Sequence, residues 1–284
     1  MIAICTFAGV RFDAEARIAR VEWGRLEGTR PRPAGSNARL GEHGFQVGVP
    51  VARLTTTDGA IGWGRASLNQ ARAEALCGKS LSELLTADPQ TSPLSRALEF
   101  PLLDLIGQLT GLPVYALFAE EAPSTPLRVR CYDTSLYFDD LHLSDDAAAV
   151  DLLVREAQEG WEKGHRAFKI KVGRGARHMP LEAGTQRDIA IIRAIRAAVG
   201  PEAPLMIDAN NGWNLNLTKR VLEETADCHI HWMEEAFHED PVLYRDLKEW
   251  LHTRGIDTLI ADGEGDAAPA LVNWAREGLI DVLQ

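Results

Sequence analysis

The sequence predicts an α/β protein, a (β/α) barrel of the TIM type preceded by an N-terminal α+β unit. Two observations carry this prediction. Beyond about residue 125, apolar runs alternate strictly with helical segments, as expected of a parallel sheet built from repeated strand–helix units. No glycine-rich phosphate-binding loop follows the first of these runs, which disfavours an open nucleotide-binding sheet. A barrel is therefore the favoured arrangement.

Residues 1–125 form the N-terminal α+β unit in this interpretation. Strands precede helices here, and Asp58-Gly59 is typical of a hairpin turn between two strands. Gly111 and Pro113 stop the clearest helix. The segment 28–48 is rich in Gly, Pro, Arg and Asn and has no apolar period, which predicts a long functional loop. The expected elements are strands over 16–23 and 49–57, that loop, and a helix over 95–110.

Residues 126–284 contain the predicted strand–helix repeats. Asp145, Asn214 and Asp240 stand where helix N-caps belong, and Pro241 suits a first helical position. Strands are predicted near 128–135, 167–172, 204–208, 229–234, 257–261 and 279–283. Helices are predicted near 145–163, 181–199, 215–225, 241–254 and 267–277.

Composition limits the class of partner and the compartment. The net charge of −11 argues against a nucleic-acid partner, because a phosphate-binding surface is expected to be basic. The N-terminus lacks the basic region of a signal peptide, and no apolar stretch is long enough to span a membrane. Four cysteines without a Cys-x-x-Cys pair suit reduced thiols. We therefore expect a cytoplasmic protein that acts on a small molecule without a membrane.

Polar residues recur at the ends of the predicted strands. A Lys-x-Lys at Lys169 and Lys171 is followed by Asp208, Glu234 and Glu264, with steps of 39, 26 and 30 residues counted from Lys169. These steps are close to the length of one strand–helix unit, so the five side chains should meet at one end of the sheet.

This residue set predicts metal-dependent removal of a proton next to a carboxylate. The resulting enediolate carries a second negative charge, which a divalent cation stabilises. Mg²⁺ prefers oxygen ligands, and Asp208, Glu234 and Glu264 would supply them from neighbouring strands. Lys169 and Lys171 point to the same face of a strand, so each cation is expected to lower the pKa of the other. Lys171 thereby suits a neutral base.

Each assignment has a structural alternative. The two lysines also suit a half-buried strand, since apolar residues alternate with them, and Asp208 before Ala-Asn-Asn-Gly also suits a turn. Glu235 is better explained as a supporting carboxylate than as a ligand. We interpret His229 and His231 as packing or surface residues. The early loop either binds a substrate carboxylate or hydroxyls or is simply solvated, and its polar candidates are Arg30, Arg32, Asn37, Arg39 and His43.

Four motifs together resemble the enolase superfamily, in its mandelate racemase branch, which includes muconate lactonizing enzymes. They are Lys-x-Lys at 169–171, Asp-x-Asn at 208–210, Trp-x-Glu-Glu at 232–235 and Gly-Glu at 263–264. The resemblance implies a capping domain over 1–125 and barrel strands one to six over 126–284. It also implies a homo-oligomer acting on a small carboxylate with Mg²⁺. The implied roles are a general base at Lys171, a pKa-lowering and carboxylate-binding neighbour at Lys169, metal ligands at Asp208, Glu234 and Glu264, and a substrate or metal-water contact at Asn210.

The sequence departs from this branch in three places. Ala236-Phe237 replaces a usual proline, which we interpret as a loop change. Asp262 competes with Glu264 as the third ligand, because muconate lactonizing relatives use an Asp near this position; Gly263-Glu264 favours Glu264. The sequence ends at Gln284, before the sixth-strand Asp, the seventh-strand His and the eighth-strand acid of the branch. We therefore expect an incomplete barrel and a fragment of the catalytic machinery.

The favoured function is a Mg²⁺-dependent lyase that dehydrates an acid sugar. Racemisation or epimerisation and cycloisomerisation share the first proton-abstraction step and remain alternatives within the superfamily. A chain without the second acid/base is also consistent with a non-catalytic, truncated binding protein. A Schiff-base aldolase using Lys169 or Lys171 is a further alternative, although the three carboxylates disfavour it.

Overall fold

The chain, represented by a computed structural model, divides into two compact units. The structure describes residues 4–7, 10–85, 97–119, 121, 125–264 and 268–284. The first unit comprises Met1–Thr29 with Gln46–Val129, and the second comprises Arg30–Phe45 with Arg130–Gln284. The predicted helix starts at 95 and 267 lie outside the described residues.

The first unit combines antiparallel strands with helices, which confirms the predicted α+β organisation. Strands β1 (Ile4–Phe7) and β2 (Val10–Asp13) pair antiparallel. A second sheet has the order β3-β4-β5, in which β4 and β5 are antiparallel. Its strands are β3 (Ile18–Ala34), β4 (Gly44–Thr56) and β5 (Ile61–Arg65). The helices are α1 (Gln70–Leu76), α2 (Leu81–Leu84), α4 (Glu99–Thr110) and α5 (Val114–Leu117).

The prediction of a long loop over 28–48 was wrong in its extent. Strand β3 continues to Ala34 and β4 begins at Gly44, so residues 35–43 alone form the connection. Prolines 31 and 33 concealed the strand from sequence reasoning, because proline removes a ladder hydrogen bond. They are tolerated here since β3 lies at the edge of its sheet.

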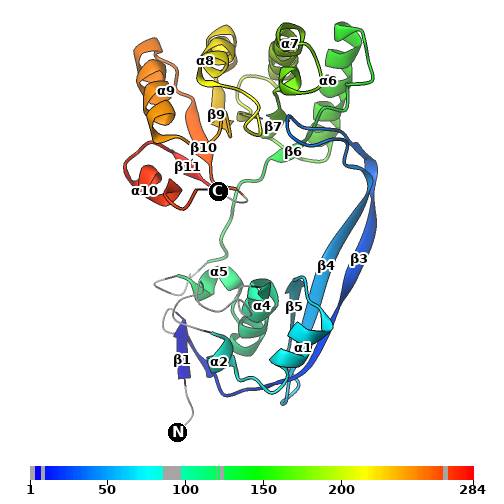
Figure 1. Ribbon diagram of the computed structural model, residues 1–284, viewed down its shortest axis with the longest axis vertical. Coiled ribbons are helices and arrows are strands. Elements are labelled where there is room, and N and C mark those ends of the chain that lie inside the picture. The colour runs from blue at the N-terminus through cyan, green and yellow to red at the C-terminus, as the bar shows by residue number, and fades with distance from the viewer. Residues whose placement is uncertain (1–3, 8–9, 86–96, 120, 122–124, 265–267) are drawn as a thin grey trace. The chain divides into compact units, whose positions relative to one another are not determined.

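The second unit is a parallel sheet in sequence order, as predicted. Its six strands are ordered β11-β10-β9-β8-β7-β6, and each neighbouring pair is parallel. The strands are β6 (Asp133–Leu136), β7 (Phe168–Lys171), β8 (Leu205–Asp208), β9 (Ile230–Glu234), β10 (Leu259–Asp262) and β11 (Val282–Leu283). The helices are α6 (Asp146–Glu162), α7 (Leu181–Val199), α8 (Leu215–Glu224), α9 (Pro241–Arg254) and α10 (Leu271–Arg276), with 3₁₀ turns η1 (Arg174–Ala176) and η2 (Ala226–Cys228). Figure 1 shows α6 to α9 side by side along this sheet.

The predicted helix caps of the second unit are confirmed. The side chains of Asp145, Asn214 and Asp240 each accept from backbone amides in the first turn of α6, α8 and α9, respectively. Pro241 occupies the first turn of α9. These caps satisfy amide groups that the helix itself leaves without partners. The sequence therefore fixes where each helix leaves the end of the preceding strand.

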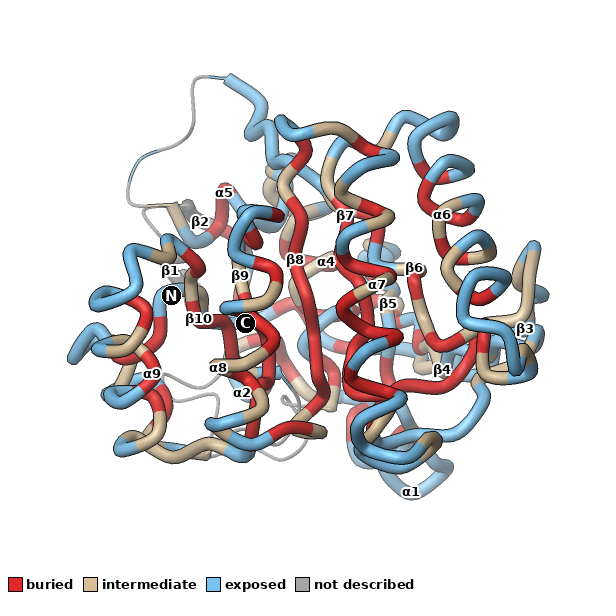
Figure 2. The backbone as a smooth tube through the Cα atoms, turned by 90° about the horizontal axis from the view of Figure 1, so that it is seen from above, coloured by how far each residue is buried: buried red, intermediate tan, exposed pale blue. Residues whose placement is uncertain are grey.

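The faces of the central strands differ in chemistry. Phe168 and Ile170 of β7 belong to the apolar core shared with the helices, together with Leu205 and Ile207 of β8. Figure 2 shows β7 and β8 as largely buried segments. Because side chains alternate along a strand, Lys169 and Lys171 emerge on the opposite face. The sheet thus separates its apolar core from a polar inner surface.

Candidate metal and proton-transfer site

The ends of three neighbouring strands bring four of the predicted polar residues close together. Lys171 of β7 is in register with Asp208 of β8, and Asp208 with Glu234 of β9. Lys169 precedes Lys171 by two residues and shares its face. The side chains of both acids have no exposed surface, and those of the lysines are 5% and 7% exposed. Four of the predicted residues therefore form one buried cluster.

The cluster is held by ion pairs between strands. Nζ of Lys169 lies 2.5 Å from Oε1 of Glu234 and 3.5 Å from Oδ2 of Asp208. Nζ of Lys171 donates to Oδ2 of Asp208. Two ammonium groups thus balance two carboxylates in a place that water scarcely reaches. Such a pairing is required, since an unpaired buried charge costs several kcal/mol, roughly 3–5 when one partner is removed.

These charges shift the pKa values of the cluster. Burial opposes the charged form of Lys169, but the carboxylates of Asp208 and Glu234 outweigh it and raise the pKa of Lys169 above its usual value. Burial and the neighbouring Asp208 raise the pKa of Glu234. The expectation that adjacent cations lower the pKa of both lysines is thus wrong for Lys169 in this structure, because the carboxylates lie closer than the sequence pattern alone reveals.

The oxygen atoms of the cluster suit a divalent cation. Asp208 and Glu234 supply carboxylates, and Oδ1 of Asn210 is buried with no hydrogen-bond partner among the described residues. Both nitrogens of Asn210 are occupied, since its backbone N donates to Asp208 at 2.9 Å and its Nδ2 to Glu235 at 2.8 Å. Hard oxygen donors of this kind are those that Mg²⁺ prefers. The residues present therefore fit the metal that the motifs predict.

The third acid is not part of the cluster. In the part of the chain that the structure describes, no three acidic, histidine or cysteine side chains are grouped to hold an ion. Glu264 is exposed and follows the end of β10, beyond Gly263 with its φ of 125°. Of the six predicted site residues, Glu264 alone lies outside the arrangement at the ends of β7, β8 and β9.

Asp262, the alternative third ligand, is occupied elsewhere. Ala261 is the residue of β10 in register with Glu234, so Asp262 falls on the other face of the strand. There Oδ2 of Asp262 accepts from the hydroxyl of Tyr244 on α9 at 2.5 Å, and Oδ1 accepts from the backbone N of Gly263 at 2.8 Å. The carboxylate of Asp262 is therefore engaged on the face of β10 away from Glu234, and the choice of Glu264 stays a prediction.

Backbone conformation at the strand ends is strained. Asn210, Asn211 and Glu235 have φ values of 44°, 60° and 43°, in the left-handed region that side chains rarely adopt. The carboxylate of Glu235 accepts from the side chains of both asparagines, and burial raises its pKa to about 7. Glu235 thereby links the ends of β8 and β9, as a supporting carboxylate would.

Sequence reasoning assigned no role to two aromatic residues that contact the cluster, although it quoted Trp232 in a motif. Nε1 of Trp232 donates to Oε2 of Glu234 at 3.0 Å, and the ring of Tyr132 lies 5.3 Å from Nζ of Lys169. Trp232 and Glu234 stand two residues apart on a strand and so share a face. That spacing was the signal available in the sequence for Trp232. No comparable signal marked Tyr132.

A buried arginine network also escaped prediction. Arg174 has no exposed surface and donates to Asp140 at 2.5 Å, to Asp188 at 2.7 Å and to the carbonyl of Lys171 at 3.3 Å. Asp188 also accepts from the backbone N of Gly173 at 2.8 Å. No role is predicted for residues 173–178 from the sequence. An arginine in a glycine-rich segment carries no sequence signal of burial.

The connection between β3 and β4, which we call the 35–43 loop, is fastened to the strand ends of the second unit. Ser36 forms a bridge with Phe138, and the carbonyl of Asn37 lies 2.8 Å from Nε2 of His178. The methyl group of Ala38 lies so near Gly173 and Gly212 that an added Cβ would approach it to 2.9 and 2.6 Å. The loop therefore lies over the ends of β7 and β8.

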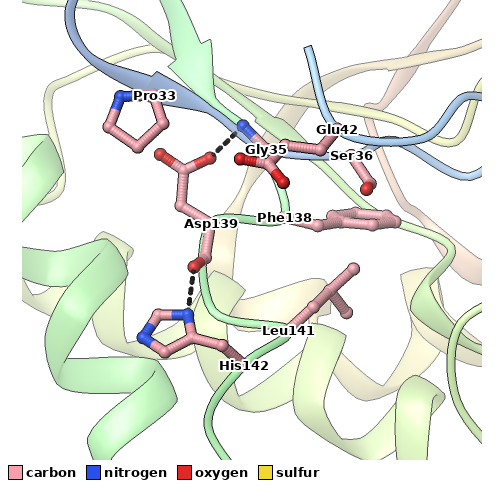
Figure 3. A pocket seen from close by; sticks show the side chains of 8 residues that line it. All are labelled: Pro33, Gly35, Ser36, Glu42, Phe138, Asp139, Leu141 and His142. Carbon is pink, nitrogen blue, oxygen red and sulfur yellow. Dashed lines mark hydrogen bonds between the residues drawn. The ribbon is translucent and has the colours of Figure 1, made fainter. Parts of the chain in front are cut away.

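A pocket of about 310 Å³ lies beside this loop, away from the charged cluster. Figure 3 shows Asp139 at its centre, accepting from the backbone N of Gly35 at 2.6 Å, while the Asp139 carbonyl lies 3.0 Å from Nδ1 of His142. None of the six predicted site residues lines it. Its lining residues are Pro33, Gly35, Ser36, Glu42, Phe138, Asp139, Leu141 and His142.

Comparisons with known proteins agree with the fold and the motifs. A family model described as "Enolase C-terminal domain-like" matches residues 152–284. A mutant galacturonate dehydratase from Geobacillus sp. complexed with Mg is 50% identical, with a TM-score of 0.89, over 96% of this chain and 72% of that one. The galacturonate dehydratase from Geobacillus sp. complexed with D-galacturonate and 5-keto-4-deoxy-D-galacturonate is also 50% identical, with a TM-score of 0.85, over 95% of this chain and 72% of that one.

The chain belongs to the enolase superfamily, in its mandelate racemase/muconate lactonizing enzyme branch. Among curated relatives, D-galactarolactone cycloisomerase from Agrobacterium fabrum is 28% identical over 82% of this chain. Hydrophobic dipeptide epimerase from Enterococcus faecalis is 29% identical over 66% of this chain. The chain spans 62% and 46% of the length of these two relatives. In the described ranges, no helix has the length and apolarity needed to cross a bilayer.

Proposed function

We propose that this chain carries the metal-binding and base half of a Mg²⁺-dependent acid-sugar dehydratase active site, with D-galacturonate or a close relative as substrate. The observation that carries the proposal is the buried cluster of Lys169, Lys171, Asp208 and Glu234 at adjoining strand ends. The 50% identity to a galacturonate dehydratase supports dehydration as the reaction. The proposed metal ligands are Asp208, Glu234 and Glu264.

Bound Mg²⁺ would stabilise the negative charge that gathers on the substrate carboxylate when the neighbouring proton leaves. Lys169 donates to the same carboxylate and so fixes its orientation. Asn210 offers its unpartnered Oδ1 to a substrate hydroxyl or a metal-bound water. These contacts hold the α-carbon beside Lys171.

Lys171 takes the α-proton at Nζ when that amine is neutral. The β-hydroxyl then leaves with acid assistance as water, so one proton and one hydroxide are lost and a double bond forms between the α- and β-carbons. Tautomerisation of this enol gives a keto-deoxy acid. The ring of Tyr137 lies 5.5 Å from Nζ of Lys171, beside the proposed base.

The test combines turnover with isotope exchange. The full chain is incubated with D-galacturonate and Mg²⁺ in deuterated water, and both keto-deoxy product and α-deuterium are measured. Lys171→Ala should lower turnover by roughly 10²–10⁴-fold, the usual contribution of a positioned base. Lys163→Ala, an exposed lysine at the end of α6, is the matched control and should be fully active.

Chelation should abolish turnover, and added Mg²⁺ should restore it. Deuterium incorporation without loss of water would indicate racemisation or epimerisation instead of dehydration. Unchanged turnover of Lys171→Ala, or indifference to the chelator, would overturn the proposal. Borohydride trapping of a substrate–lysine adduct would identify the aldolase alternative, since the proposed reaction forms no imine.

A further inference from the structure

The polar side chains in and next to the 35–43 loop differ in whether their hydrogen-bonding atoms already have partners. The Arg30 guanidinium donates to two backbone carbonyl groups at residues 43 and 44, and that of Arg32 donates to Ser135. Oδ1 of Asn37 accepts from two backbone amides within the loop. Arg39 is exposed. These groups therefore hold the loop in shape or face solvent.

His43 differs from Arg32, whose Nη1 also lacks a hydrogen bond but lies 3.2 Å from the carboxylate of Glu156, because the buried ring nitrogen of His43 has no such ion pair among the described residues. Its Nε2 is buried and forms no hydrogen bond to any described residue. The backbone of His43 is fixed, since its N donates to the carbonyl of Ala34 at 3.0 Å. A buried nitrogen without a hydrogen-bond partner destabilises the folded chain. A water molecule or a ligand can supply the missing partner, so this nitrogen is available to a bound molecule.

The position of His43 connects it with the charged cluster. The His43 ring packs edge-on against Tyr137, with centroids 5.2 Å apart and planes at 82°. The same Tyr137 ring lies 5.5 Å from Nζ of Lys171. His43 and the proposed base thus contact one aromatic ring from the loop and from the sheet, respectively.

The chemistry of the proposed substrate matches this arrangement. An acid sugar held by its carboxylate at Lys169 carries its remaining hydroxyl groups away from the reacting carbons. A hydroxyl both donates and accepts, so it suits either tautomer of a neutral imidazole. We propose that His43 is a specificity-determining residue whose Nε2 hydrogen-bonds the hydroxyl on carbon 2 or carbon 3 of the acid sugar. This inference rests on the proposed function.

The experiment measures whether His43 recognises that hydroxyl. The full chain with Mg²⁺ is assayed on D-galacturonate and on its 2-deoxy and 3-deoxy analogues, in the wild type, His43→Phe and His43→Gln. Phenylalanine keeps an aromatic edge against Tyr137 but has no polar atom, whereas glutamine keeps a polar nitrogen. His252→Phe, an exposed position on α9, is the control.

His43→Phe should raise KM for D-galacturonate roughly 10–100-fold with a smaller change in kcat, as expected for loss of one hydrogen bond to a substrate hydroxyl. It should also lose the preference for D-galacturonate over one deoxy analogue, and His43→Gln should recover part of that preference. A purely structural role would leave the ratio between substrates unchanged. That unchanged ratio in an active enzyme would overturn the inference and leave the proposed function intact.

If the wild type turns over none of these acids, the proposed function is wrong, and the role of His43 needs a separate test. Calorimetric titration of D-galacturonate into the Mg²⁺-loaded wild type and His43→Phe then decides the role of His43 in binding. Weaker binding by His43→Phe, relative to the wild type and His252→Phe, would support the inference. Equal affinity, or no binding by the wild type, would overturn it.

Discussion

The ammonium group of Lys169 lies between the carboxylates of Glu234 and Asp208, 2.5 and 3.5 Å from their nearest oxygens. Lys169 therefore occupies oxygens that we assign to Mg²⁺. A metal at this place would neutralise the same two carboxylates as Lys169. When one of the two cations is present, the other therefore adds less to the stability of the folded chain. The stability of the chain and its affinity for metal are coupled through this contact.

Lys169→Met tests the coupling. Without Lys169 the buried Glu234 carboxylate loses its cation, and the chain should lose about 3 kcal/mol of unfolding free energy in chelator. Saturating Mg²⁺ should restore most of this loss, because the metal replaces the missing positive charge. Urea denaturation in chelator measures the loss, and urea denaturation in Mg²⁺ measures the recovery. Lys163→Met is the surface control. Equal stability of Lys169→Met and wild type in chelator would contradict the prediction.

The third ligand is tested by comparing two neighbouring acids. Glu264→Gln should leave stability in chelator unchanged, since Glu264 is exposed, but should remove most of the stabilisation by Mg²⁺. Asp262→Asn should destabilise the chain by about 1–3 kcal/mol, because it disturbs the buried contact with Tyr244. Thermal denaturation across a Mg²⁺ titration distinguishes the two. A Mg²⁺ response that survives Glu264→Gln but not Asp262→Asn would reverse the assignment.

The parallel sheet and its polar strand ends were predictable from the sequence because both depend on local patterns. Alternating apolar and polar positions fixed the faces of β7, and the capping residue Asp145 fixed a helix start. The burial of Arg174 and the extent of β3 were not predictable in the same way. Each depends on partners distant in sequence, Asp140 for the arginine and strand β4 for β3.

The network around Arg174 should matter far more for stability than a surface ion pair. Arg174→Met leaves Asp188 buried without this cation and Asp140 with Arg187 alone, 3.3 Å away, and should cost about 3–5 kcal/mol. Arg193→Met removes the exposed pair with Asp227 and should cost less than about 1 kcal/mol. Urea denaturation of the two variants gives the comparison. Similar losses would show that the buried network does not stabilise the chain through its charges.

Glu156 gives a prediction about pH. Its side chain is 6% exposed; Oε1 lies 3.2 Å from Nη1 of Arg32, and Oε2 has no hydrogen-bond partner among the described residues. Burial and the nearby Asp139 carboxylate raise the pKa of Glu156 from 4.5 to about 8, and Arg32 offsets only part of this rise. The folded chain therefore keeps a proton that the unfolded chain releases between these two values.

Stability should accordingly fall as pH rises through this window and level off above it, because the folded state binds more protons there than the unfolded state. The contribution of Glu156 is on the order of 3 kcal/mol. Urea denaturation at several pH values gives the unfolding free energy of the wild type and of Glu156→Gln. The difference between the two pH dependences is the contribution of Glu156. Glu162→Gln, an exposed position on α6, is the matched control. If the wild type does not lose stability relative to Glu156→Gln between pH 5 and pH 8, or gains stability relative to it, Glu156 is ionised in the folded chain.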